Sequence, residues 1–210
     1  MSKSKKNVVD PNDIIASYGA DTARWFMLSD SPPERDLQWT DTGIAASFKF
    51  INKLYEFIEK YKNYKSDYSK DEKILNELKT IVNEVSKYIE AFQFNKSVAK
   101  IYEFVNILND TLLKNGLSQE NFKWSLEKLA IILQPFVPHI SEEIWSNIGN
   151  KTLCINENWT LEDVEKHSEL KIAIQINGKT KEIIEIGDKF SKEKILEIVK
   201  DNDKIKKNIL

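Results

Sequence analysis

The sequence is poor in the residues that build disulfide-stapled, zinc-bound or fibrous proteins. Its 210 residues include one Cys, six Gly, five Pro and two His. The single Cys154 cannot form an internal disulfide, and two histidines with one cysteine cannot complete a zinc site made of those residue types. The low Gly and Pro content excludes collagen-like and low-complexity chains. We therefore expect no structural metal site in this chain.

Long apolar runs and a large net charge are also missing. No stretch approaches the roughly 18 apolar residues of a membrane-spanning helix, and the charged start at 1–6 is not followed by the apolar part of a secretory signal. The 31 basic and 33 acidic residues leave a net charge of −2, which argues against a uniformly basic nucleic-acid-binding surface but permits local basic patches. We expect a cytoplasmic protein with no membrane partner.

Apolar and aromatic residues are plentiful. They make up 41% of the chain and include 10 Phe, 7 Tyr and 5 Trp. This content excludes wholesale disorder, and the length suits one or two domains with a buried core.

The first 43 residues contain signals for two short helices. Asp10 is a typical N-cap, Pro11 suits the first helical position, and Gly19 is a stop signal. Asp21 can cap a second helix, which the proline pair at Pro32 ends. The Ser/Lys-rich residues before Asp10 lack periodicity and predict a loop.

From residue 44 onward, apolar residues recur at spacings of three and four. Four stripes follow this rule: Ile44, Phe48, Ile51, Tyr55 and Ile58; Ile74, Leu78, Ile81, Val85 and Phe92; Val98, Ile101, Val105, Leu108 and Leu112; and Phe122, Leu126, Leu129 and Leu133. They predict four amphipathic helices in an antiparallel bundle. Pro135 and Pro138 break the fourth helix, and a further helix follows up to Gly149. The aromatic residues of the stripes, together with Tyr102, are interpreted as core rather than as nucleobase-stacking groups.

The pattern changes near the end of the chain. Residues 150–168 lack a period and predict a linker in an acidic neighbourhood: 141–165 holds six Asp/Glu and one Lys, a net of −5. From Lys171 the period is two, and Asn177-Gly178 predicts a hairpin turn. A plain two-residue turn would pair Lys179 with Ile176 and Lys181 with Ile174, whereas a bulge at Gly178 would shift this register. A helix is predicted from Ser191.

Three residue types outside these patterns receive non-catalytic interpretations. His139 lies in an apolar kink and has no carboxylate–nucleophile pair around it, which favours a packing or capping role. Cys154 has no activating basic cluster and is expected to be inert. Glu142 and Glu143 are neighbours in sequence, cannot share a helix face, and are interpreted as solvated surface.

Several motifs together resemble one enzyme family. They are Met1-Ser2-Lys3-Ser4, Tyr18-Gly19-Ala20-Asp21-Thr22-Ala23-Arg24, the block from Pro32 to Asp41, the block from Pro135 to Trp145, and Gln175-Ile176-Asn177-Gly178-Lys179. The first resembles the KMSKS signature of class I aminoacyl-tRNA synthetases without its leading lysine. The Pro32–Asp41 block is similar to bacterial leucyl-tRNA synthetases rather than to the isoleucyl, valyl or methionyl enzymes.

The resemblance implies an ATP site in the first residues. Met1, Ser2, Lys3 and Ser4 would form the loop that closes over ATP, with Lys3 as the lysine that contacts the phosphates and Ser2 and Ser4 as its hydroxyl positions. A lysine suits this role because its flexible point charge can follow a phosphate as negative charge builds on it. ATP, with Mg²⁺, would be the cofactor of the whole enzyme, and no metal ligand is assigned to this chain.

The resemblance also implies contacts with tRNA(Leu). Lys5 and Lys6 would add positive charge near ATP or the acceptor end, with a merely solubilising role as the alternative. Residues 166–210 contain 11 Lys and 8 Asp/Glu, a net of +3, and Lys179 and Lys181 would meet the phosphate backbone. Lys181 stands where the family often has arginine, and the strand that would follow the last helix is absent.

These observations predict a mainly α fold, with a helical bundle followed by a small α+β domain lacking its last strand. The expected division is a KMSKS loop with its following helices (1–43), an anticodon-binding bundle (44–149), a linker (150–168) and a partial tRNA-contacting domain (169–210). The chain would be the C-terminal part of a monomeric leucyl-tRNA synthetase, which activates leucine with ATP and transfers it to tRNA(Leu), and would be inactive alone. The alternatives are a stand-alone helical tRNA-binding or interaction module and a fragment of another class I synthetase.

Overall fold

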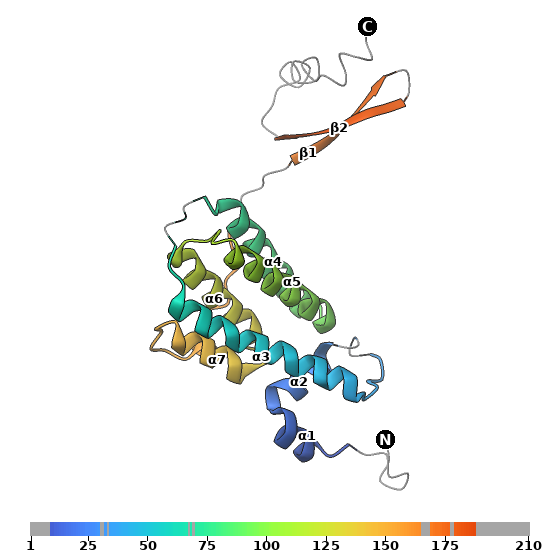
Figure 1. Ribbon diagram of the computed structural model, residues 1–210. Helices are drawn as coiled ribbons and strands as arrows, with labels where there is room; N and C mark the ends of the chain where they lie inside the picture. Colours follow the sequence, from blue (N-terminus) through green and yellow to red (C-terminus); the bar gives the residue numbers. More distant parts are fainter. Residues whose placement is uncertain are drawn as a thin grey trace. The chain divides into compact units, whose positions relative to one another are not determined.

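The chain divides into two units, residues 1–164 and 165–210, which are described separately. The computed structural model describes residues 9–29, 32, 34–66, 68, 70–164, 169–176 and 179–187 (Figure 1). The expected mainly α architecture with a helical bundle is confirmed.

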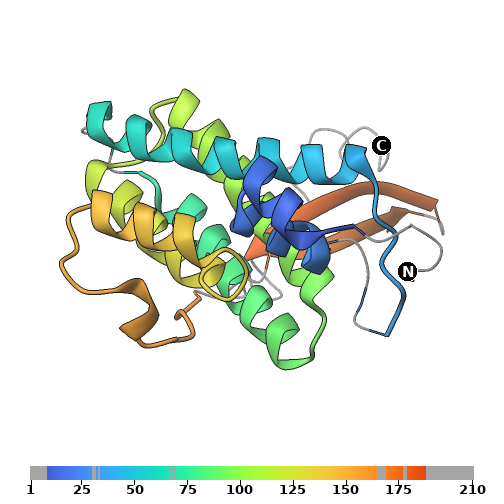
Figure 2. The same cartoon turned by 90° about the horizontal axis from the view of Figure 1, so that it is seen from below.

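The first unit is an assembly of seven α-helices in its described part. They are α1 (Pro11–Tyr18), α2 (Ala20–Ser29), α3 (Asp41–Asn63), α4 (Glu72–Glu90), α5 (Phe94–Leu113), α6 (Gln119–Leu133) and α7 (Pro138–Asn147), followed by a short 3₁₀ helix, η2 (Cys154–Asn156). Helix α4 packs along α5, α6 along α7, and α2 against α3 and α5 (Figures 1 and 2).

Local signals set several helix ends as the sequence predicts. The Asp10 carboxylate accepts a 2.9 Å hydrogen bond from the Asn12 N–H, and α1 ends at Gly19, whose φ of 83° lies in the left-handed region that glycine tolerates. Thr40 and Ser118 cap α3 and α6 through their hydroxyl oxygens. Pro138 occupies the first turn of α7, where its missing N–H costs no hydrogen bond.

The core of the first unit follows the predicted stripes over most of their length. All five residues of the third stripe and all four of the fourth are buried. The fully buried Trp25 of α2 joins this core, which ties the short N-terminal helices to the bundle.

Three aromatic residues expected in the core are exposed instead. Phe48, Tyr55 and Phe92 expose 38%, 45% and 68% of their surface. Phe92 lies beyond the end of α4 at φ 55°, so the helical period no longer applies to it. Phe48 and Tyr55 lie at the edge of the buried face of α3, beside a surface groove described below. The prediction that these three aromatic residues lie in the core is therefore wrong.

Helices α2 and α3 approach each other closely at Gly43. A Cβ at this position would lie 2.5 Å from Phe26 Cε2 and 2.7 Å from Thr40 Oγ1. Only glycine leaves room for the Phe26 ring next to the α3 N-cap. This contact fixes the spacing of the two helices.

Residues 151–164, named the strap here, pack against the bundle, although we expected a linker over 150–168. The Trp159 indole N–H donates to Ser86 Oγ at 2.8 Å, and Glu162 and Asn83 exchange two 2.8 Å hydrogen bonds between main chain and side chain. The Glu162 carboxylate also forms a 2.6 Å ion pair with Lys128. The strap residues have no hydrophobic period, because polar contacts hold them in place. This is why the sequence pattern suggested a linker.

The second unit contains a β-hairpin of β1 (Glu169–Ile176) and β2 (Lys179–Gly187), paired antiparallel. Lys179 pairs with Ile176, as the plain turn predicts, but Ile174 pairs with Glu182, so that Lys181 lies in a bulge. The register therefore shifts at Lys181, whereas Gly178, where the sequence offered a bulge, lies outside the described residues. The predicted Asn177-Gly178 turn and the predicted helix from Ser191 lie outside the described residues.

None of the helices in the described part of the chain is long and apolar enough to cross a membrane.

Candidate functional site

The predicted ATP-loop residues precede the described part of the chain. Met1, Ser2, Lys3 and Ser4, together with Lys5 and Lys6, lie outside the described residues, which begin at Val9. The structure shows the two helices that follow them, α1 and α2. Lys179 and Lys181 are strand positions of β2 in the second unit.

Arg24 of α2 binds the turn that connects α6 to α7. Its guanidinium donates from Nε to the Phe136 carbonyl at 2.8 Å and from Nη2 to the Pro135 carbonyl at 2.7 Å. Both carbonyls lie beyond Leu133, the last residue of α6, and the guanidinium gives each of them a charge-assisted hydrogen bond.

Asp21, one turn earlier on α2, binds the start of α7. One carboxylate oxygen lies 2.8 Å from the Ile140 N–H, and the other lies 2.8 Å from His139 Nδ1 and 3.4 Å from the His139 N–H. We expected Asp21 to cap its own helix, but α2 already begins at Ala20. Asp21 instead caps α7, whose own N-cap position, Val137, offers no side-chain hydrogen bond.

His139 has neither the packing nor the capping role that the sequence favours, because Asp21 caps α7 and the imidazole contacts that carboxylate. Its side chain is 74% exposed and pairs with Asp21, which is 9% exposed. The imidazole therefore covers one oxygen of the buried Asp21 carboxylate, while the Ile140 N–H binds the other.

A surface groove of about 370 Å³ lies beside this corner, between the α1–α2 junction, α3 and α7. Tyr18, Phe48 and Tyr55 supply aromatic walls, with the Tyr18 and Phe48 rings edge to face at 5.7 Å. Partial burial raises the pKa of Tyr55, and the negative charges of Asp21 and Glu143 raise it further. The groove thus has aromatic walls and negative charge nearby, and this charge disfavours the binding of a phosphate group.

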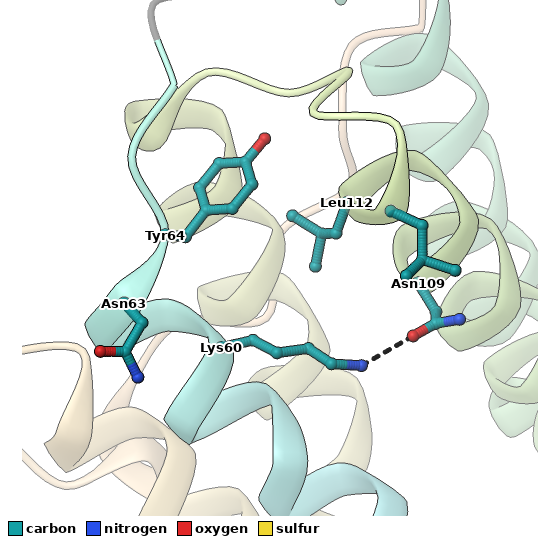
Figure 3. Close-up of a pocket in the computed structure, with 6 residues that line it drawn as sticks. Lys60, Asn63, Tyr64, Asn109 and Leu112 are labelled. Carbon is teal, nitrogen blue, oxygen red and sulfur yellow. Dashed lines mark hydrogen bonds between the residues drawn. The ribbon is translucent and has the colours of Figure 1, made fainter.

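A second pocket, of about 260 Å³, lies between the end of α3 and the end of α5 (Figure 3). The Lys60 ammonium donates to Asn109 Oδ1 at 2.8 Å, and the Tyr64 hydroxyl donates to the Leu117 carbonyl at 2.6 Å. Lys60 also lies over the Phe57 ring at 5.1 Å. Because these polar groups hold α3, α5 and the following loop together, this pocket is structural.

Glu142 anchors the strap to α7 and is not simply solvated surface. Its carboxylate accepts hydrogen bonds from the N–H groups of Cys154 at 2.8 Å and Ile155 at 3.0 Å, and from the Gln134 amide at 2.8 Å. Cys154 is buried, which raises the pKa of its thiol to about 11. The expected inertness of Cys154 agrees with this burial.

Among the residues that the structure describes, no group of three or more His, Cys, Asp or Glu side chains is arranged to hold a metal ion. The sequence patterns did not predict the contacts of Arg24, which appeared only within a motif, of Glu142, which was interpreted as surface, or of the strap residue Glu162. For Arg24, the spacing Asp21-x-x-Arg24 was an available signal, since residues three apart share a helix face.

Two family models match the chain. Residues 71–199 match the anticodon-binding domain of tRNA ligases, and residues 1–40 match the class I tRNA synthetases for I, L, M and V. The chain therefore belongs to the anticodon-binding domain family of tRNA ligases.

Two curated relatives of this chain are leucine–tRNA ligases. A leucine–tRNA ligase of Crocosphaera subtropica is 36% identical over 100% of this chain and 25% of its own length. A leucine–tRNA ligase of Cereibacter sphaeroides is 40% identical over 85% of this chain and 20% of its own length. The chain is thus homologous to the C-terminal part of leucyl-tRNA synthetases and spans about a quarter of the length of these relatives.

Solved structures agree with this relationship. A LeuRS of Agrobacterium radiobacter K84, in a ternary complex with tRNA and LeuAMS, matches 100% of this chain and 29% of its own, with a TM-score of 0.81 and 26% identity. A methionyl-tRNA synthetase of Mycobacterium tuberculosis, in complex with methionyl-adenylate, matches 75% of this chain and 41% of its own with a TM-score of 0.55 and 15% identity, which shows a shared fold alone.

Proposed function

We propose that this chain supplies the ATP loop and tRNA-binding parts of a leucyl-tRNA synthetase. The whole enzyme would activate leucine with ATP and Mg²⁺ and transfer it to tRNA(Leu). The observation that carries the proposal is the identity of 36–40% to leucine–tRNA ligases over 85–100% of the chain. The two family matches, at residues 1–40 and 71–199, support the proposal.

Within this proposal, the residues keep the roles that the resemblance implies. Lys3, between Ser2 and Ser4, would stabilise the pyrophosphate leaving group. The bundle would contact tRNA. The functional division of the chain would follow 1–43, 44–164 and 169–210, because the strap packs on the bundle. The enzyme would act as a cytoplasmic monomer.

Leucine-dependent ATP–pyrophosphate exchange tests the proposal. A full-length protein carrying these 210 residues should exchange pyrophosphate with leucine at least about 100-fold more efficiently (kcat/KM) than with isoleucine, valine or methionine, because a synthetase discriminates by differential transition-state binding. Equal rates with another of these amino acids would reassign the substrate. No exchange with any of them would contradict the proposal.

The 210-residue chain should bind tRNA weakly and in a salt-dependent way. Contacts between lysines and phosphates release counterions, so log K should fall linearly with log salt. Titration of labelled tRNA at several salt concentrations measures this slope. Replacing Lys179 and Lys181 with Gln should reduce the slope by about 2 if each meets one phosphate. An affinity that does not change with salt would refute the electrostatic contact.

Replacing both Lys179 and Lys181 with Arg is the matched control, because it keeps two positive charges at the same positions of β2. This variant should leave the slope within about 0.3 of the parent chain, since counterion release depends on the positive charges that meet phosphates. An equal loss of slope in the Arg and Gln variants would contradict the proposed charge contact.

A further inference from the structure

Helix α1 depends on other elements for its position. None of its residues is buried; Gly19 connects it to α2, and the Tyr18 ring meets Phe48 of α3 edge to face. Figure 1 shows α1 at one end of the first unit, next to α2. Because residues 1–8 are covalently continuous with α1, the placement of α1 and α2 determines where that segment starts.

Helix α2 is anchored in the core mainly through Trp25. The Trp25 ring stacks on Phe50 at 4.7 Å and meets Tyr102 and Phe136 edge to face, and its indole N–H donates to the Tyr102 hydroxyl at 2.9 Å. The buried Phe26, which packs against Gly43 of α3, adds a second aromatic contact. Such dispersion contacts fix the depth of a helix but have little directionality. Directional contacts are needed to fix the helix orientation.

Asp21 and Arg24 supply those directional contacts on the side of α2 that faces the α6–α7 corner. Both bind main-chain atoms: Asp21 binds N–H groups at the N-terminal end of α7, and Arg24 binds carbonyls of the turn between α6 and α7. The negative charge of Asp21 is favourable at the positive end of the α7 dipole, and the bonds of Arg24 are charge-assisted. The backbone groups that they bind lie in or next to a connection whose φ angles Pro135 and Pro138 restrict. These groups do not move when side chains change rotamer, so the α6–α7 corner is a rigid attachment point for α2.

We propose that Asp21 and Arg24 are positioning residues that lock the α1–α2 hairpin to the α6–α7 corner and thereby place the segment before α1 for leucine activation. The part concerning leucine activation rests on the proposed function. Neither residue needs to touch ATP, leucine or tRNA. Their effect acts through the position of the hairpin, because a displacement of about 1 Å at a reacting group can cost about 100-fold in rate.

Hydrogen exchange of the 210-residue chain tests the lock itself. Asp21→Asn and Arg24→Gln should each raise amide exchange in α1 and α2 by about tenfold while leaving α4 and α5 unchanged, because the hairpin opens without unfolding the bundle. Lys100→Gln is the matched control, since it removes two 2.8 Å ion pairs, to Glu84 and Glu103, elsewhere in the bundle. Unchanged exchange in α1 and α2 of both lock variants, or equal acceleration there in Lys100→Gln, would overturn the proposal.

Steady-state kinetics of the full-length protein test the consequence for activation. The two lock variants should lower kcat for amino-acid-dependent pyrophosphate exchange about tenfold with little change in the KM for the amino acid, and Arg24→Lys should recover part of the loss. Lock variants with wild-type kcat would overturn the positioning role. A wild-type protein that prefers another amino acid would contradict the leucine assignment, and the same comparison would then be made with that amino acid.

Discussion

Replacing Trp25 with alanine should lower the free energy of unfolding of the helical unit by about 4 kcal/mol, as expected for a buried aromatic side chain cut back to a methyl group. Trp25 is fully buried and contacts Phe50, Tyr102 and Phe136 from three different parts of the chain. Its removal would leave a cavity and an unpaired Tyr102 hydroxyl, whose pKa is already raised by burial. Urea unfolding followed by far-ultraviolet circular dichroism measures the change.

Two further variants separate the contributions of packing and hydrogen bonding. Trp25→Phe keeps a ring in the core but loses the indole donor, and should cost roughly half as much as the alanine substitution. Phe92→Ala truncates an aromatic side chain that is 68% exposed and should change stability by less than about 0.5 kcal/mol. A loss below about 1 kcal/mol for Trp25→Ala would contradict the anchoring role of α2.

Replacing Lys3 with alanine should slow leucine activation about 100-fold in a full-length synthetase that carries this chain. The loss corresponds to one charge-assisted contact with a phosphate, worth about 1.5–3 kcal/mol. Because the charge on the leaving group develops in the transition state, kcat should fall more than the KM for leucine rises. Steady-state ATP–pyrophosphate exchange over a range of leucine concentrations is the measurement.

Lys73→Ala provides the comparison for Lys3, since it removes the same side chain from an exposed position of α4. It should leave the activation rate within twofold of wild type. Lys3→Arg should restore part of the rate, because the positive charge is kept while its compact geometry is lost. An unchanged exchange rate in Lys3→Ala would remove Lys3 from the proposed ATP loop.

The bundle could be predicted from the sequence because its signals are local and periodic. The Asp10 cap, the Gly19 stop and the stripe from Val98 to Leu112 each depend on neighbours within one or two helical turns. The exposure of Phe48 and Tyr55 could not be predicted from local periodicity. Whether the edge of a stripe is covered depends on where α1, α2 and α7 lie relative to α3. That placement is a tertiary property.

The contacts of the candidate site could not be predicted for the same reason. Asp21 reads as a cap in its own sequence context, yet it caps a helix more than one hundred residues later. Glu142 has the sequence context of a surface residue, but two N–H groups of the strap donate hydrogen bonds to its carboxylate. Capping by a distant side chain leaves no periodic trace, and the strap depends on individual hydrogen bonds rather than on an apolar repeat. The class of protein was nevertheless predictable, because its motifs occur in order along the chain.

The burial of Cys154 makes the strap observable in solution. Cys154 is the single cysteine of the chain, and the Ser141 hydroxyl and the Glu142 carboxylate contact its thiol and N–H. Only the thiolate reacts with alkylating reagents, so both the burial of this strap residue and its raised pKa of about 11 protect the thiol. The alkylation rate of Cys154 therefore reports how often the strap detaches from the bundle. The dependence of this rate on denaturant concentration would distinguish local detachment of the strap from unfolding of the whole bundle.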